Sequence, residues 1–177
     1  LQSRGLGDVY KRQVLIHSHN DYQKNIPFYR AYSQQVHTIE ADIYAAPASD
    51  GLLVAHDPHE LDSALSLDEM YLEPLIFLFG QNEGRPWRGS EQVLTLMIDL
   101  KTPLHPTIDR LIAKLKRHPE VFDPSVNPYA VRIVISGSRP DPEAFGEYPR
   151  FISFDGFIDV DYTPQQLERV AFISEPF

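Results

Sequence analysis

The chain alternates short apolar runs with segments in which apolar residues recur at helical spacing. Six runs have the composition of strands, at residues 14–19, 37–46, 93–102, 131–137, 151–157 and 171–177. The segment 105–122 carries an apolar stripe from Ile108 to Leu115, which indicates an amphipathic helix. Shorter helices are predicted over residues 27–36 and 163–170.

Strands that alternate with helices predict a mainly parallel sheet covered by helices, here with one hairpin turn at residues 50–51. A doubly wound sheet would normally carry a glycine-rich turn after its first strand, and residues 14–19 are not followed by one. We therefore predict an α/β fold of the TIM (β/α)8-barrel type. Because such a barrel usually needs about 250 residues and the chain has 177, we expect it to be incomplete at the C-terminus, with about six barrel strands.

The chain divides into two parts in this interpretation. Residues 1–13 show no period and no apolar segment of a signal peptide, so we interpret them as an unrelated leader. Their net charge is +2. Because the whole chain carries −9, residues 14–177 carry −11. Residues 14–177 are predicted to form the truncated barrel domain.

Composition excludes several classes of function. A net charge of −9 without a basic patch argues against general nucleic-acid binding, because a polyanion would be repelled. The apolar run at residues 74–79 is far shorter than the roughly 20 residues of a membrane-spanning helix. The absence of cysteine excludes disulfides and thiolate ligands, so any metal would be bound by oxygen or imidazole.

Polar side chains gather at the ends of the predicted strands and, in the second strand, within it. The residues in question are His17, His19, Asn20, Glu40, Asp42, His56, Asp57, Asp99 and Lys101. In a barrel the carboxyl ends of the strands converge on one mouth, which is where active sites lie. We therefore expect these side chains to form one site.

Three carboxylates of this set are candidates for metal binding. Glu40 and Asp42 share one face of a strand, and Asp99 lies on a neighbouring strand. Clustered carboxylates repel one another unless a cation compensates, and oxygen ligands favour Mg²⁺ or Ca²⁺ over zinc. The alternatives are a solvated strand face for Glu40 and Asp42 and an ion pair between Asp99 and Lys101. For the histidines they are a structural role for His19 and a surface turn at residues 56–57.

Four blocks together resemble the phosphatidylinositol-specific phospholipase C and glycerophosphodiester phosphodiesterase superfamily. They are HSHNDY at 17–22, IEAD at 39–42, LLVAHD at 52–57 and IDLKT at 98–102. The resemblance implies a phosphoric diester hydrolase of lipid metabolism that depends on Mg²⁺ or Ca²⁺. The superfamily's glycerophosphodiesterases begin with His-Arg-Gly where this chain has His-Ser-His-Asn, so the substrate could be a glycerophosphodiester or a phospholipid.

The same resemblance implies a role for each residue. The implied metal ligands are Asn20, Glu40, Asp42 and Asp99. The implied catalytic residues are His19 and His56 as proton carriers and Lys101 as a phosphate contact, with His17 as the other candidate for the first histidine. A phospholipid substrate would bring transient contact with a membrane surface, and the family implies a secreted or periplasmic location.

Other interpretations stay open at this level. His17 and His19 could open an amidohydrolase-type metal site, although such a site needs histidines on later strands and the last histidine is His118, on a predicted helix. A barrel fragment could also be an inert or binding module, because missing strands leave open sheet edges. In the region 61–90, Arg85, Trp87 and Arg88 could contact a substrate anion or form an exposed loop.

Overall fold

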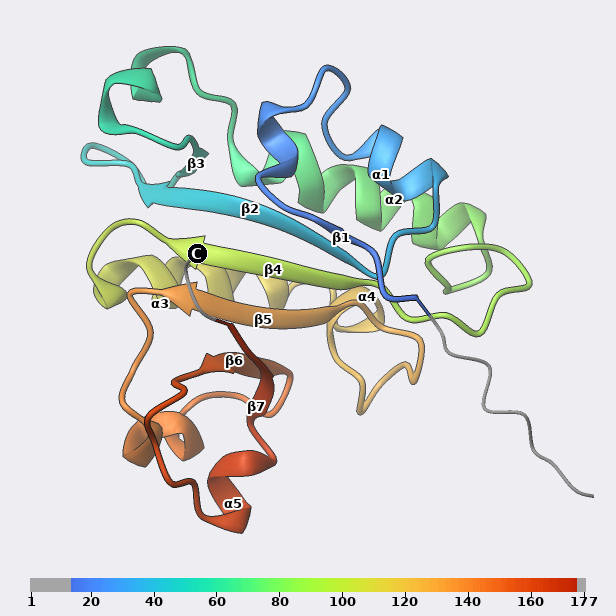
Figure 1. Cartoon of the computed structure of the whole chain (residues 1–177). Coiled ribbons are helices and arrows are strands. Elements are labelled where there is room, and N and C mark those ends of the chain that lie inside the picture. The colour runs from blue at the N-terminus through green and yellow to red at the C-terminus, as the bar shows by residue number, and fades with distance from the viewer. Residues whose placement is uncertain (1–13, 175–177) are drawn as a thin grey trace, which may run out of the picture.

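The computed structural model describes residues 14–174, so the predicted leader at 1–13 and the last three residues of the predicted final strand lie outside the described part. A sheet of six parallel strands runs in the order β1-β2-β4-β5-β6-β7. These strands are β1 (His17–Ser18), β2 (Thr38–Ala45), β4 (Thr95–Leu100), β5 (Arg132–Gly137), β6 (Ile152–Gly156) and β7 (Val170–Ile173). The sheet curls into a half-barrel (Figure 1). The expected parallel α/β architecture with about six barrel strands is confirmed.

One further strand belongs to the hairpin that the sequence predicted. β3 (Leu52–Val54) runs antiparallel to β2, with Ala45 opposite Leu52. The turn between them leads the chain out from the carboxyl end of β2 and back again (Figure 1). As a result, the residues that follow β3 return to the end of the sheet where β2 ends.

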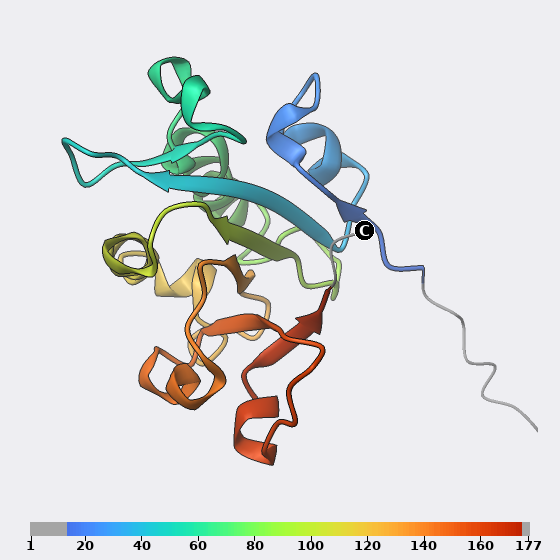
Figure 2. The same ribbon diagram turned by 60° about the vertical axis from the view of Figure 1, so that its left-hand side comes forward.

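Helices cover the outer, convex face of the curled sheet (Figure 2). The helices and helical turns are η1 (Asp21–Gln23), α1 (Tyr29–Ser33), η2 (Pro58–Ser63), η3 (Asp68–Leu72), α2 (Glu73–Gln81), α3 (Leu104–Leu115), α4 (Pro119–Phe122), η4 (Pro142–Glu147) and α5 (Pro164–Leu167). Within the described residues, no helix is both long and apolar enough to span a bilayer.

The core lies between the sheet and these helices. Ile39 and Ile43 of β2 are fully buried, and so are Ile108 and Leu111 on the apolar stripe of α3. Full burial of an aliphatic side chain stabilises the fold by about 1.5–3 kcal/mol. The predicted spacing of the stripe in α3 is thus confirmed, because its apolar positions face the sheet.

The first strand is much shorter than the predicted strand at residues 14–19. Only His17 and Ser18 pair with β2, whereas Val14, Leu15 and Ile16 are exposed. β1 lies at one edge of the sheet, where it pairs on one side only within residues 14–174. An apolar run therefore did not mark a buried strand here, because composition alone cannot distinguish a central strand from an edge.

All three predicted helices are shorter than expected, since α5 ends at Leu167 and β7 already begins at Val170; for the other two the backbone geometry gives the reason. The segment 105–122 forms α3 and α4 with a break before Pro119, since the residue before a proline is disfavoured in helical conformation. α1 ends near Gln35, which has a left-handed φ of 51°. In α5 the capping role of Thr163 is confirmed, because its side chain accepts a hydrogen bond from the backbone of Gln166.

Candidate functional site

Three carboxylates come together from the middle of β2 and the carboxyl end of β4. Glu40, Asp42 and Asp99 each place an oxygen within 4.8 Å of the other two. The register explains this cluster, because Asp42 pairs with Asp99 and Glu40 lies two residues earlier on the same face of β2. Glu40 is 7% exposed and Asp42 is 1% exposed. The alternative of a solvated strand face is therefore wrong.

Lys101, directly after β4, supplies a positive charge to this cluster. Its Nζ lies 2.9 Å from Oδ2 of Asp42 and 3.3 Å from Oδ1 of Asp99. The ion pair that the sequence allowed between Asp99 and Lys101 is thus present, and it extends to Asp42. Burial alone would lower the pKa of Lys101, but the hydrogen bond to Asp42 and the charges of both carboxylates raise it.

The environment shifts the pKa values of two of the carboxylates in opposite directions. Burial raises the pKa of Asp99, and the ion pair with Lys101 offsets this only in part. Burial would also raise the pKa of Glu40, but a hydrogen bond with His17 and the nearby histidine and lysine charges lower it overall. Glu40 is therefore held as an anion, whereas ionisation of Asp99 is made less favourable by its surroundings.

Both histidines of the first block approach the same carboxylate. Nε2 of His17 lies 2.8 Å from Oε2 of Glu40, and Nε2 of His19 lies 3.8 Å from the same oxygen. His17 belongs to β1, whereas His19 lies in the turn that follows it, so the two imidazoles reach Glu40 from a strand and from a turn. The side chain of His19 is 70% exposed, so this imidazole is open to a substrate, whereas His17 is hydrogen-bonded to Glu40.

His56 reaches the cluster from the segment after β3. Its Nδ1 lies 3.2 Å from Oδ2 of Asp42 and 3.1 Å from the hydroxyl of Tyr22, which itself donates to Asp42 at 2.9 Å. Burial and the Asp42 carboxylate raise the pKa of Tyr22 strongly, which keeps its hydroxyl protonated as a donor. Sequence reasoning gave Tyr22 no role, although it stands in the quoted HSHNDY block.

Two residues at the end of β5 support Asp99 and were also missed. The Ser136 hydroxyl donates to Oδ2 of Asp99 at 3.3 Å. A Cβ added to Gly137 would lie 2.4 Å from Oδ1 of Asp99, so only glycine leaves room for this carboxylate. The signal was available in principle, because the polar end of this strand follows the same pattern as the ends of the other strands.

Some of the residues singled out in the sequence lie apart from the cluster or are not joined to it. Asn20 has a left-handed φ of 46°, and no hydrogen bond joins its side chain to the carboxylates among the described residues. Asp57 caps η2 together with Glu60, so it serves the surface turn that the sequence allowed.

The loop with Arg85, Trp87 and Arg88 is not part of the site. It precedes β4 and lies at the opposite end of the sheet from the carboxylates. Trp87 is buried, and its indole donates to the backbone carbonyl of Tyr32. Arg85 and Arg88 donate to backbone carbonyls of Ser90 and Gln81. Of the two alternatives for this loop, contact with a substrate anion is therefore not supported by the geometry, and the exposed loop holds for Arg88 but not for buried Trp87.

The donor set favours a hard cation over zinc. The described residues of β4, β5, β6 and β7 contain no histidine that could complete an amidohydrolase-type centre with His17 and His19. Three clustered carboxylate oxygens are the ligands that Mg²⁺ and Ca²⁺ prefer in proteins. The cluster therefore fits the cation class that the sequence predicted.

Comparisons with known proteins show which family the chain resembles. A family model described as AIM6-like phosphodiesterase domain matches residues 7–122. "Altered inheritance of mitochondria protein 6" of Eremothecium gossypii is 32% identical over 97 residues, which cover 49% of this chain and 25% of that protein. The protein of the same name from Kluyveromyces lactis is 34% identical over 70 residues, 39% of this chain and 17% of that protein.

A third relative is "Altered inheritance of mitochondria protein 6 homolog" of Arthroderma benhamiae. It is 33% identical over 106 residues, which cover 50% of this chain and 33% of that protein. The chain thus matches a third or less of the length of each of these three curated relatives. No solved structure matches the chain significantly.

Proposed function

Because the chain belongs to the AIM6-like phosphodiesterase domain family, we propose that it is a metal-dependent phosphoric diester hydrolase acting on a glycerophosphodiester or phospholipid. One observation carries this proposal. Glu40 and Asp42 join Asp99 in a carboxylate cluster, with His19 beside Glu40 and His56 beside Asp42. A phosphodiester bound at the cluster would have a proton carrier on either side.

The fold supports a more specific relationship. The six parallel strands follow one another in chain order, except for the hairpin strand, and the site lies at their carboxyl ends. Both features suit a TIM-type barrel of the phospholipase C and glycerophosphodiester phosphodiesterase kind. The four sequence blocks that resemble this superfamily contribute all of the clustered side chains.

Glu40, Asp42 and Asp99 would hold the cation in this proposal, with Asn20 as the fourth ligand that the superfamily resemblance implies. A bound Mg²⁺ or Ca²⁺ would supply positive charge that stabilises a non-bridging phosphate oxygen and lowers the pKa of the attacking hydroxyl. The charge state of the cluster supports this role, since the pKa of Glu40 is lowered and this carboxylate stays ionised.

The histidines would divide the proton transfers between them. His19, whose imidazole is exposed beside Glu40, would accept the proton of the attacking hydroxyl. His56, with Nδ1 held by Asp42 and Tyr22, would present Nε2 and protonate the departing alcohol. Such general acid–base catalysis contributes about 10²- to 10⁴-fold to a rate. His17 would keep Glu40 oriented through its hydrogen bond.

Lys101 would contact the phosphate. Its ammonium group is bound to Asp42 and Asp99, and the side chain is long enough to turn from these carboxylates toward a substrate oxygen. This would place a second positive charge at the reacting phosphate. A phospholipid substrate would require transient membrane contact, and a secreted or periplasmic location stays a prediction.

A substrate panel with histidine variants tests this function. The purified chain should cleave at least one glycerophosphodiester or phospholipid in Mg²⁺ or Ca²⁺ and lose the activity in EDTA. His19→Ala and His56→Ala should each lower kcat by about 10²-fold or more. His105→Ala is the control, because His105 pairs with Asp109 on the surface of α3, outside the cluster. Equal activity in all three variants would refute the assignment.

A further inference from the structure

The segment that carries the first histidines has little regular structure to hold it. Residues 18–28 join a two-residue strand to α1 and contain one short turn, η1. The backbone bonds within that turn run from Gln23 to Asn20 and from Lys24 to Asp21. A segment with so few bonds of its own would move on a fast timescale unless other contacts restrain it.

A buried carboxylate supplies those contacts. Asp21 is 1% exposed, in contrast to its exposed neighbour His19. Its oxygens accept hydrogen bonds from the Ser18 hydroxyl at 2.8 Å, the Phe28 backbone amide at 2.6 Å and the Tyr71 hydroxyl at 3.0 Å. Among the described residues no cation pairs with Asp21, so neutral donors alone compensate its burial.

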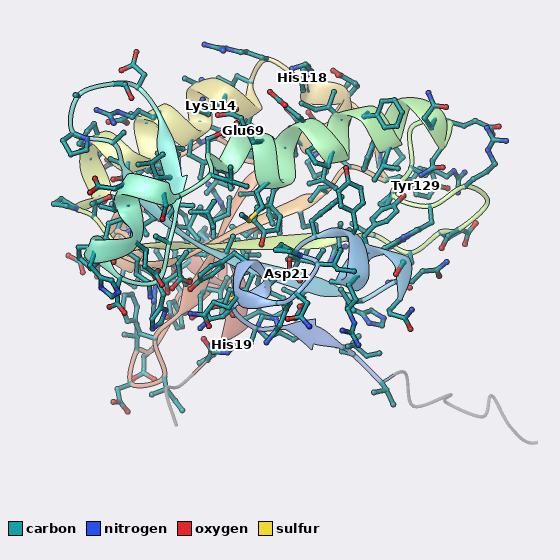
Figure 3. All side chains as sticks on the ribbon, turned by 90° about the horizontal axis from the view of Figure 1, so that it is seen from above. His19, Asp21, Glu69, Lys114, His118 and Tyr129 are labelled. Carbon is teal, nitrogen blue, oxygen red and sulfur yellow. The ribbon has the colours of Figure 1, made fainter. Side chains whose placement is uncertain are left out.

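The three donors come from places that matter for the site. Ser18 stands between the two histidines, Phe28 closes the segment with a left-handed φ of 58°, and Tyr71 belongs to η3 in the core. Asp21 thus joins both ends of the segment to the helix layer. Figure 3 shows Asp21 on the helix side of this segment and His19 on the opposite side.

We propose that Asp21 is a positioning residue, whose hydrogen bonds to Ser18, Phe28 and Tyr71 hold His17, His19 and Tyr22 against the carboxylate cluster. The inference deepens the proposed function and rests on it for its kinetic test. Its geometric basis is that Ser18 is bonded to Asp21 while its neighbour His17 is bonded to Glu40. Loosening the first bond would therefore displace the second, and small displacements of reacting groups cost large factors in rate.

Two variants remove one donor each and leave Asp21 in place. Ser18→Ala and Tyr71→Phe should lower kcat by about 10-fold to 100-fold, change KM little, and shift the ring ¹⁵N signals of His17 and His19. Ser18→Thr keeps a hydroxyl and should restore both properties. The control is Tyr32→Phe. The Tyr32 ring packs on Phe28 as the Tyr71 ring does, but its hydroxyl donates to the Pro86 carbonyl and not to Asp21.

The outcomes separate positioning from general stability. The three variants are compared at a similar loss of Tm. If Ser18→Ala and Tyr71→Phe then change kcat and the histidine ¹⁵N signals no more than Tyr32→Phe does, Asp21 has no positioning role. If the chain cleaves no phosphodiester at all, the proposed function fails, while the histidine signals of the same variants still decide whether Asp21 positions the segment.

Discussion

The ammonium group of Lys101 bridges two carboxylates, lying 2.9 Å from Oδ2 of Asp42 and 3.3 Å from Oδ1 of Asp99. The lysine thus balances part of the charge that burial makes costly in the cluster. A divalent cation bound to the same carboxylates would take over this compensation. Lys101 and a bound metal are therefore both expected to stabilise the fold by compensating the charges of Asp42 and Asp99.

Replacing the lysine should make the fold depend more on metal. Lys101→Met is expected to lose about 1–3 kcal/mol of stability in EDTA, because Asp42 and Asp99 lose a cation in a partly buried place. Added Mg²⁺ should then raise its Tm more than that of the wild-type chain. Lys114→Met is the control, since Lys114 pairs with Asp68 away from the cluster. Equal Mg²⁺ shifts in all three chains would contradict the shared role.

Asp99→Asn should stabilise the metal-free chain at neutral pH. Folding raises the pKa of Asp99 above its ordinary value of 3.8, mainly through burial, so the folded chain binds this proton more tightly than the unfolded chain does. The ionised carboxylate therefore destabilises the fold above the raised pKa, and this penalty disappears as the pH falls through that value and below 3.8.

Thermal unfolding of both chains in EDTA across a pH series measures this effect. The advantage of Asp99→Asn should be present at neutral pH and vanish in acid. In Mg²⁺ the order should reverse, because the variant has lost a ligand. An Asp99→Asn chain that is less stable than wild type at neutral pH without metal would show that the ion pair with Lys101 outweighs burial.

Gly137 should be intolerant of a side chain because an added carbon would clash with the Asp99 carboxylate and with the backbone of Leu100. A methyl group there would lie 2.4 Å from Oδ1 of Asp99, and the backbone has a left-handed φ of 67°. Gly89 has a similar φ of 73° but nothing within 4 Å of the added carbon. Both alanine variants should lose about 1–2 kcal/mol for the backbone conformation alone.

Only Gly137→Ala should also weaken the binding of Mn²⁺, a divalent cation used here to probe the carboxylate cluster. Calorimetric titration of both variants checks this, with a loss of about tenfold or more in affinity expected for Gly137→Ala. Equal Mn²⁺ affinities in the two variants would mean that the Asp99 carboxylate has no part in binding the cation.

Tyr22→Phe should impair the proton transfer assigned to His56. The Tyr22 hydroxyl lies 3.1 Å from Nδ1 of His56 and donates to Asp42, so its loss leaves Asp42 as the one remaining partner of Nδ1 among the described residues and holds the imidazole less firmly. We expect kcat to fall about tenfold. Tyr44→Phe is the control, because the Tyr44 hydroxyl donates to the backbone carbonyl of His56 and not to its ring. We expect kcat to fall less in this variant. The reverse order of the two effects would exclude a role for Tyr22.

The carboxylate cluster was predictable because strand periodicity is a local rule and because the strands of a parallel sheet end on the same side. Alternation put Glu40 and Asp42 on one face, and the expectation of a parallel sheet brought Asp99 beside them. Tyr22 was not predictable in the same way. Its hydroxyl reaches Asp42 only because the segment after β1 folds around buried Asp21, and no period records that contact.

Burial was the other property that sequence patterns misjudged. Val14, Leu15 and Ile16 have the composition of a buried strand, yet they are exposed beside an edge. Trp87 stands in a polar, glycine-containing loop, yet it is buried against Tyr32. In both cases the outcome depends on which elements pack nearby, and this is a tertiary property that the local pattern of apolar residues does not contain.

The most direct test of a metal-dependent phosphodiesterase is the rate of phosphodiester cleavage by the metal-stripped chain as Mg²⁺ or Ca²⁺ is returned, compared with Asp42→Asn. The wild-type rate should start near zero and rise to saturation with one of the two cations. The Asp42→Asn rate should stay near zero throughout, because Asp42 is one of the three clustered carboxylates and also pairs with His56. Cleavage at the same rate in EDTA, or an undiminished rate in Asp42→Asn, would contradict the proposed function.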